Sequence, residues 1–485
     1  MPKHLSVLLI FIFSLNIFAQ KYFSGEISRD THWIGDVHID GDVIVPRGVI
    51  LSIESGSRVF FKPHYDSQHG GMDKERAEII VNGVLLARGA GAQTPILFSS
   101  ESSQAQMNDW YGIILKNLNN KSILKNCVIE FGYKGITCYG SVPLISDSEI
   151  RFNYNSGISC EVRAKPEIED CVIVGNGFSG INAELASSPQ VSGCTITQNT
   201  YGIMIFSRSE PDLGHFPKKD GLSKGENRIY NNFDFDVYNH STSSIYAQNN
   251  IWSTKTADEI RTSIYDTMEN PAYGQVIFEP QFSVKKTYRY TPFAAAQNEN
   301  TREASDQNNT LAANEGNPPE EAITANVAPS DTVRPFSGLK IQDSVANKSS
   351  ADTVKPDVPV KAVPETVYVY KPPEPKKEEK KEVRSDNPIL EAFLDSGKRE
   401  YARRVKPEYP GIYLKTGTEG DVFIEVIVGK DGNVSSYHVL KSDGELFTAS
   451  AIDALKKTQY KPGTVNGVPV KYKIVERFRF KRSTN

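Results

Sequence analysis

Short apolar runs alternate with turn residues along the first half of the chain, and one sequence motif recurs every 22 or 23 residues. A Gly-Ile pair marks one position of this repeat, at Gly135, Gly157, Gly180 and Gly202. A fixed short period predicts a solenoid, because each unit buries its apolar face only against the next copy. The runs have strand length and no helical period, so we expect a β-solenoid in which like residues stack from coil to coil.

Three further positions of the repeat hold asparagine, proline or a small residue. They are Asn153, Asn176 and Asn199; Pro143, Pro166, Pro189 and Pro211; and Cys127, Ser148, Cys171 and Cys194. All five cysteines lie between Cys127 and Cys194, and an odd number cannot all pair. We expect small buried residues here, while a bridge between neighbours such as Cys171 and Cys194 stays sterically open.

The earlier coils keep the strand pattern with less regularity. Residues 43–61 predict two strands and a turn, residues 109–113 read Asp-Trp-Tyr-Gly-Ile, and residues 249–252 read Asn-Asn-Ile-Trp. These segments resemble the right-handed parallel β-helix family, which is pectin-lyase-like. The resemblance covers about half of the chain and implies a β-helix over residues 21–290.

The first 20 residues predict export. Lys3 precedes an apolar run from Leu5 to Phe18, and the small residue Ala19 follows at a plausible cleavage point. The run is short for a membrane span, which needs about 20 apolar residues, so we expect a cleaved signal peptide and no stable span. An uncleaved anchor is the alternative. A net charge of −4 gives no steering toward nucleic acid, and we place the mature chain in the periplasm or cell envelope.

Residues 291–385 have a different composition. They are rich in Pro, Ala, Glu and Lys and poor in large apolar residues, and residues 371–382 form a charged, proline-rich run. Such a segment buries too little apolar surface to offset its ordering entropy. We expect a disordered tether between two folded regions.

Residues 386–485 return to a folded pattern. Two strands, a helix and a closing strand are predicted at 422–428, 434–440, 446–457 and 472–480. The Asp431-Gly432 pair predicts a hairpin turn between the first two strands. Helical spacing places four residues on one face: Phe447, Ala451, Ala454 and Leu455. This ββαβ order predicts a small α+β domain with an antiparallel sheet.

Seven motifs in this region stand in a familiar order. They occupy residues 407–410, 419–422, 428–434, 440–444, 451–455, 460–463 and 466–470. Together they closely resemble the TonB-type C-terminal domain, from about residue 405 to residue 480. In that family the domain pairs a strand with a short box peptide of an outer-membrane receptor. The resemblance therefore implies an envelope protein as partner, such as a TonB-dependent receptor.

The closing strand is the candidate partner-binding element. One face is apolar and is expected to pack on the helix: Tyr472, Ile474, Phe478 and Phe480. The other face is basic, and the family resemblance implies that an edge here accepts a partner strand, with Arg477 and Arg479 selecting acidic partners. The alternative is that the basic residues only protect an exposed edge from aggregation.

Aromatic residues just before the repeated glycines form a second candidate site. Tyr133, Tyr154, Phe178 and Tyr201 would stack as a ladder along the solenoid. The ladder is either a packing stack at a turn or a platform for sugar rings.

Catalytic chemistry is weakly represented. Asp234 and Asp236 would share a strand face, but glycoside hydrolysis needs two carboxylates across one substrate site. Asp147 and Asp170 repeat one coil apart, yet Gly193 fills the next slot, which favours a turn position. We expect no catalytic residue.

A metal site is weakly represented as well. His64, Asp66, His69 and Asp73 cluster in an early insert, but their spacing matches no standard zinc pattern. We expect neither a metal nor a cofactor.

The sequence thus predicts a mainly β protein: a right-handed parallel β-helix, a disordered linker and a small α+β domain. Its expected role is non-catalytic, as an exported envelope scaffold whose C-terminal domain docks on a partner while the β-helix binds a glycan or protein. A polysaccharide lyase or hydrolase on the β-helix is one alternative. A TonB-like energy transducer for transmembrane transport is another.

Overall fold

The structure is a computed structural model that describes residues 21–116, 122–252, 256–282 and 388–482. The predicted signal peptide and the predicted tether, residues 1–20 and 291–385, lie outside the described residues. The two folded regions, before and after the tether, fall within one compact unit. Among the described residues, no helix has the length and apolarity needed to cross a membrane.

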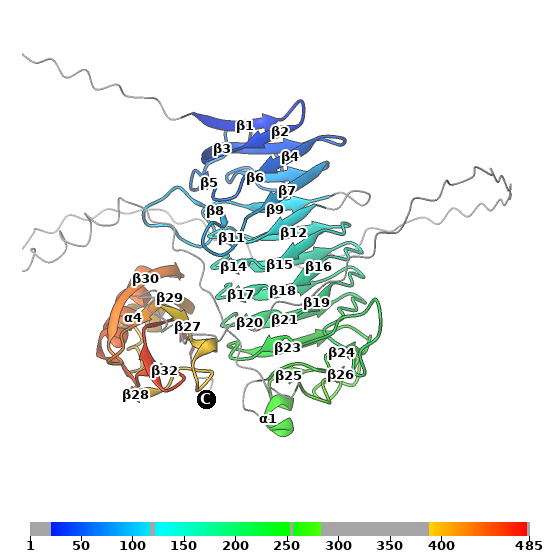
Figure 1. Ribbon diagram of the computed structural model, residues 1–485. Coiled ribbons are helices and arrows are strands. Elements are labelled where there is room, and N and C mark those ends of the chain that lie inside the picture. The colour runs from blue at the N-terminus through cyan, green and yellow to red at the C-terminus, as the bar shows by residue number, and fades with distance from the viewer. Residues whose placement is uncertain (1–20, 117–121, 253–255, 283–387, 483–485) are drawn as a thin grey trace, which may run out of the picture. The chain divides into compact units, whose positions relative to one another are not determined.

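The first folded region is a parallel β-helix, in which successive coils stack from β1 to β25 (Figure 1). Its strands form three columns, and β3 (Asp36–Val45) contributes to two of them and pairs with β1 (Tyr22–Glu26). The first column continues with β5 (Arg58–Phe61), β8 (Ile96–Ser100), β11 (Cys127–Glu130), β14 (Glu149–Arg151), β17 (Val172–Val174), β20 (Thr195–Thr197) and β22 (Arg228–Ile229). The second continues with β6 (Glu78–Val81), β9 (Gly112–Leu115), β12 (Ile136–Tyr139), β15 (Ser156–Glu161), β18 (Ser179–Ala183), β21 (Tyr201–Phe206), β23 (Phe235–His240) and β25 (Ile264–Tyr265).

The third column is a seven-stranded sheet. It consists of β2 (Thr31–Trp33), β4 (Ile50–Ile53), β7 (Val84–Arg88), β10 (Ile123–Lys125), β13 (Leu144–Ser146), β16 (Glu167–Glu169) and β19 (Gln190–Ser192). The last coil adds the pair β24 (Ile245–Tyr246) and β26 (Val276–Ile277), and the short helix α1 (Ala257–Arg261). Thr256 caps the N-terminus of α1, and Ile260 of this helix lies in the core at the C-terminal end of the β-helix.

Isoleucines stack at one register through the interior of the β-helix. Ile136, Ile158, Ile181 and Ile203 pair in succession, and all four are fully buried. Burial of such a side chain contributes about 1.5–3 kcal/mol. The repeated Gly-Ile pair of the sequence is therefore a core position, which confirms the predicted stacking of like residues.

The repeated asparagines form a buried ladder at one corner. Asn153 donates its backbone N–H (3.1 Å) and its amide (2.9 Å) to Oδ1 of Asn176. Asn176 makes the same pair of bonds to Asn199, at 2.9 and 3.0 Å, and Asn199 makes them to Asn232. The ladder satisfies backbone N–H groups at a corner where the chain leaves the strand direction.

Another corner accounts for the repeated aspartates. Asp147 and Asp170 have φ of 48° and 50°, and Gly193 in the next coil has 68°. Asn and Asp tolerate this left-handed conformation better than most residues, and glycine adopts it freely. The interpretation of this position as a turn is confirmed.

The second folded region is a small α+β domain (Figure 1, yellow to red). Its four-stranded sheet has the order β27-β34-β29-β30, with β27 (Ile389–Leu390), β34 (Tyr472–Phe480), β29 (Gly420–Val428) and β30 (Val434–Ser442). The helix α4 (Glu445–Lys457) lies between β30 and β34 in sequence, so the ββαβ order is confirmed. The smaller elements are η1 (Glu391–Phe393), β28 (Tyr401–Arg403), α3 (Gly411–Thr416), β31 (Gln459–Tyr460), β32 (Gly463–Val465) and β33 (Val468–Val470).

The core of this domain lies between α4 and one face of the sheet. The buried residues of α4 are the four whose spacing predicted a helix face: Phe447, Ala451, Ala454 and Leu455. They share one cluster with the apolar face of β34, which consists of Tyr472, Ile474, Phe478 and Phe480. The rings of Phe447 and Phe480 stack at 4.4 Å between centroids. The predicted packing of the closing strand on the helix is confirmed.

Candidate partner-binding surface

The closing strand β34 differs on its two sides. On one side it pairs antiparallel with β29 from Tyr472 to Phe480, and on the other it pairs with β27 only at Tyr472 and Lys473. The strand is therefore not a simple sheet edge. Its outer side beyond Lys473 is met by side chains rather than by another strand.

A buried ion network holds the segment that follows β27 against this outer side. Arg399 contacts both carboxylate oxygens of Glu391, at 2.7 and 2.8 Å, and lies 3.0 Å from Glu476. Its Nη1 also donates to the carbonyl of Val475 at 2.9 Å. Although burial alone would lower the pKa of Arg399, the neighbouring glutamates raise it well above its usual range. The guanidinium therefore occupies a backbone acceptor that a pairing strand would otherwise use.

The two arginines of β34 point at carboxylates instead of solvent. Arg477 lies 2.8 Å from Asp421 and 3.3 Å from Asp234, and its side chain is 8% exposed. Arg479 contacts the same two carboxylates at 3.3 and 3.2 Å and is 33% exposed. Burial lowers the pKa of Arg479, but the hydrogen bond and charge of Asp234 outweigh it and raise that pKa. These residues thus lie on the face of β34 opposite α4, as the alternation predicts, but acidic residues of β29 and of the β-helix cover them.

Lys473 is covered in the same way. Its Nζ lies 3.5 Å from Oε1 of Glu149, a fully buried carboxylate on β14 that also contacts Arg151 at 2.7 Å. Although burial alone would raise it, the charges of Arg151 and Lys473 lower the pKa of Glu149 to about 2. Sequence reasoning missed Glu149, since a lone glutamate at the start of a strand looks solvated.

The aromatic ladder forms in part. Tyr133 stacks on Tyr154 with centroids 5.8 Å apart and planes at 21°, and Tyr111 extends this stack at 5.4 Å. Phe178 instead meets Tyr201 edge to face, at 5.5 Å and 70°. Stacked rings use their faces on each other and turn their edges outward. Sugar rings need an open aromatic face, so the stacked tyrosines fit a packing role, whereas Phe178 is not stacked in this way and is 38% exposed.

Further aromatic residues, missed from the sequence, continue beyond Tyr201. Tyr238 stacks on Tyr265 at 4.5 Å and 19°, and it contacts Tyr201 edge to face at 5.4 Å. His240 and Tyr273 complete the group. The coil-to-coil register of β21, β23 and β25 brings these rings together, and the irregular spacing of the last coils hid this from the repeat pattern.

The aspartates considered for catalysis have structural partners. Asp236 is buried and accepts from the backbone N–H and amide of Asn232, at 3.3 and 3.0 Å. Asp234 contacts the two arginines of β34. Asp236, on β23, therefore serves the asparagine ladder, and Asp234, which precedes β23, contacts the C-terminal domain.

The residues of the early insert are separately engaged. Asp66 accepts from the backbone N–H groups of Gln68 and Gly70, at 2.8 and 3.0 Å, and so shapes the turn. His69 bonds a backbone carbonyl at 2.9 Å, and Asp73 pairs with Arg76. Across the ranges that the structure describes, no three or more His, Cys, Asp or Glu side chains converge as a metal site.

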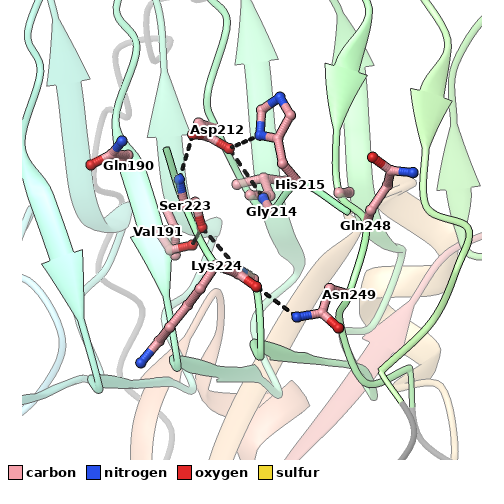
Figure 2. A network of polar contacts seen from close by, with 12 residues as sticks. Gln190, Val191, Asp212, Gly214, His215, Ser223, Lys224, Gln248 and Asn249 are labelled. Atoms are coloured by element: carbon pink, nitrogen blue, oxygen red, sulfur yellow. Dashed lines mark hydrogen bonds and ion pairs between the residues drawn. The ribbon is translucent and has the colours of Figure 1, made fainter. Parts of the chain in front are cut away.

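One polar network on the β-helix combines residue types that are familiar from hydrolases (Figure 2). Asp212 contacts Nδ1 of His215 at 3.0 Å and accepts the backbone N–H of Ser223 at 2.7 Å. The hydroxyl of Ser223, however, donates to the carbonyl of Val191 at 2.6 Å. A nucleophilic serine would be hydrogen-bonded to the histidine. The network therefore joins the long turn 212–223 to the neighbouring coil.

Comparison with known proteins matches both folded regions. A family model described as the C-terminal domain of the Gram-negative bacterial TonB protein matches residues 405–482. A model described as periplasmic copper-binding protein (NosD) matches residues 53–267.

Single relatives match the C-terminal domain. Protein TonB of Vibrio cholerae serotype O1 is 38% identical over 79 residues, which are 16% of this chain and 32% of that protein. The chain thus spans about a third of the length of this curated relative. The solution NMR structure of the Pseudomonas aeruginosa TonB C-terminal domain is 25% identical, covering 18% of this chain and 89% of that one, with a TM-score of 0.17. With the family matches and the parallel columns, the chain joins a right-handed parallel β-helix to a TonB-type C-terminal domain.

Proposed function

We propose that this protein is a binding and scaffold protein of the periplasm or cell envelope. Its TonB-type domain docks on an envelope partner by strand pairing, and a TonB-dependent outer-membrane receptor is the partner that the family favours. The matched families support the location, since one is described as periplasmic and the other as TonB. The β-helix serves as the rigid body that carries this domain.

One observation carries the proposal: β34 has a strand partner along its whole length on one side and over two residues on the other. A nine-residue strand in this state has backbone groups that an extended segment can pair with. Main-chain hydrogen bonds would supply the affinity, and the alternating basic side chains would supply the selectivity.

The test uses the full chain and a fluorescently labelled box peptide from a TonB-dependent receptor. Titration by fluorescence anisotropy is expected to give saturable binding. A matched peptide with proline at two alternate positions lacks the N–H donors of a ladder and is expected to lose that binding. Equal binding of the two peptides, or binding of neither, would contradict docking by strand pairing.

We infer a binding role for the β-helix as well, with a glycan as the favoured ligand. Phe178 supports this inference, because it is 38% exposed and meets Tyr201 edge to face instead of stacking on it, and aromatic faces stack on sugar rings. Affinity electrophoresis in gels that contain single polysaccharides is the test. Phe178→Ala should lose the retardation of the wild-type chain, and an unretarded wild type would refute the inference.

We infer that the role is not catalytic. Asp234 and Asp236, the candidate carboxylates, are engaged with arginine and asparagine side chains. Incubation with the polysaccharides retained in the gels should release no reducing sugar and no unsaturated product. Release of either product would establish the alternative, an enzyme on the β-helix.

A further inference from the structure

One corner of the β-helix repeats an uncommon backbone conformation in five successive coils. The residues there have φ between 53° and 67°, and they are Phe131, Phe152, Gly175, Gln198 and Asn231. They follow one another in the coil-to-coil register, as the bonds from Phe131 to Phe152 and from Gln198 to Asn231 show. A left-handed conformation is uncommon for residues other than glycine and is costly for a bulky residue such as phenylalanine. The corner forms a ridge of side chains that point away from the core, and we name these five residues the corner ridge.

Every member of the corner ridge meets the C-terminal domain. The N–H of Val475, on the outer side of β34, donates to Oε1 of Gln198 at 2.5 Å. Asn231 donates to the carbonyl of Gly397 at 2.9 Å. A Cβ atom at Gly175 would lie 2.9 Å from a methyl group of Val475, so only glycine leaves room there.

The two phenylalanines of the corner ridge pack on the second face of the small sheet, opposite α4. The ring of Phe131 lies edge to face with His438 at 6.3 Å. Phe152 belongs to one buried cluster with Met107, Phe423, Leu440 and Val475. Phe423, Leu440 and Val475 are at most 2% exposed. Three apolar residues of the sheet are thus removed from water by the β-helix.

Both backbone groups of Val475 are occupied within the chain. Gln198 accepts its N–H, and Arg399 donates to its carbonyl. Both groups point to the outer side of β34, where a partner strand would bind. Side chains of the β-helix and of the segment after β27 therefore make the hydrogen bonds to Val475 that a partner strand would make through its backbone.

Acidic residues of the β-helix also pair with the basic residues of β34, as an acidic partner strand would. Arg477 and Arg479 stand two residues apart on one face of β34, and Asp234 accepts from both. Glu149 does the same for Lys473. An acidic extended segment laid along β34 would meet the same three cations.

We propose that the corner ridge and Asp234 mask the partner-binding side of β34, so that the TonB-type domain is self-inhibited and an acidic extended segment must displace the β-helix to dock. This proposal rests on the proposed function and adds the chemistry of the partner and the regulation of the surface. Because the mask and the domain belong to one chain, the contact does not depend on protein concentration.

The first test measures release of the domain. Asp234→Arg places a third positive charge beside Arg477 and Arg479 and changes no residue of the C-terminal domain. Small-angle X-ray scattering of the full chain should give a larger radius of gyration than the wild type. Asp220→Arg, a charge reversal at an exposed position of the long turn 212–223, is the matched control and should leave the radius unchanged.

The second test measures access to β34. Asp234→Asn removes the masking charge without adding a positive one. The probe is a fluorescein-labelled octapeptide of Thr and Val with Glu at two alternate positions, and its counterpart carries Lys at those positions. The full-length variant should bind the Glu peptide at least about 5-fold more tightly than the wild type, which is the lower end of ordinary coupling between sites. Binding of the Lys peptide should stay weak in both proteins.

The outcomes separate the two proposals. If wild type and Asp234→Asn bind the Glu peptide equally, docking stands and the mask is refuted. If neither protein binds the Glu peptide, docking of an acidic strand is refuted. Self-inhibition is then refuted as well, even if scattering shows that the C-terminal domain is released from the β-helix. An unchanged radius of gyration in Asp234→Arg refutes the contact itself.

Discussion

The asparagine ladder gives the sharpest test of how the β-helix is held together, through the substitution Asn176→Ala. Oδ1 of Asn176 accepts the buried backbone N–H of Asn153 at 3.1 Å, and its amide donates to the carbonyl of Ile150 at 3.2 Å. Alanine removes both partners from a position that is fully buried. A buried polar group left unsatisfied costs about 1–3 kcal/mol. With two groups affected, we expect the free energy of unfolding to fall by roughly 3 kcal/mol.

Tryptophan fluorescence is a suitable assay, because all three tryptophans, Trp33, Trp110 and Trp252, lie in the β-helix. In a domain of about the size of the β-helix 1 kcal/mol shifts the melting temperature by about 2–4 °C, so a decrease of roughly 6–12 °C is expected. Gln275→Ala removes an exposed amide from the same region and is the matched control. A loss in Asn176→Ala within about 0.5 kcal/mol of that control, the usual range for a surface change, would refute the ladder as a stabilising element.

Three further predictions concern buried thiols, a buried carboxyl and a buried guanidinium. The five cysteines are free and buried, so the native protein should not react with a thiol reagent and the unfolded protein should show five thiols. Burial raises the pKa of Glu78 from 4.5 to about 8, so the folded state keeps a proton that the unfolded state loses. Stability should therefore fall as pH rises from 4.5 to 8. Glu78→Gln should flatten that part of the plot of melting temperature against pH, and an unchanged slope in this variant would contradict the prediction. Arg399→Met leaves Glu391 and Glu476 buried without their cation and should cost about 3–5 kcal/mol, measured by hydrogen exchange of the C-terminal domain, with partial rescue by a second change, Glu391→Gln.

The features that repeat or alternate along the chain were predictable from sequence. The Gly-Ile pairs placed the core ladder of Ile136 to Ile203 at the right register, and the helical spacing identified the buried face of α4, including Phe447. The exchange of Asp170 for Gly193 pointed to a turn, and both residues have positive φ. Each of these signals arises from contacts between neighbours in sequence or between equivalent positions of adjacent coils, so a local pattern contains it.

The environment of the charged residues was not predictable in this way. A basic residue on the outer face of a strand has the same sequence signature whether water or a carboxylate covers it. Arg477 pairs with Asp234 across 243 positions of sequence, and no periodicity connects them. Gln198 carries no signal either, because its role comes from the corner it occupies and from the N–H of Val475.

The two interpretations left open for the basic face of β34 are reconciled by this pairing. An unpaired strand side is prone to aggregate and needs protection, and a docking strand needs backbone groups that a partner can reach. Basic side chains alone cannot meet both needs, since they leave the N–H and carbonyl groups of Val475 open. The β-helix meets both, because Gln198 occupies the N–H and Asp234 binds the arginines through contacts that an acidic strand can replace one for one. On this argument Asp234, which was weighed and set aside as a catalytic carboxylate, has its effect in the C-terminal domain, where it substitutes for a carboxylate of the partner.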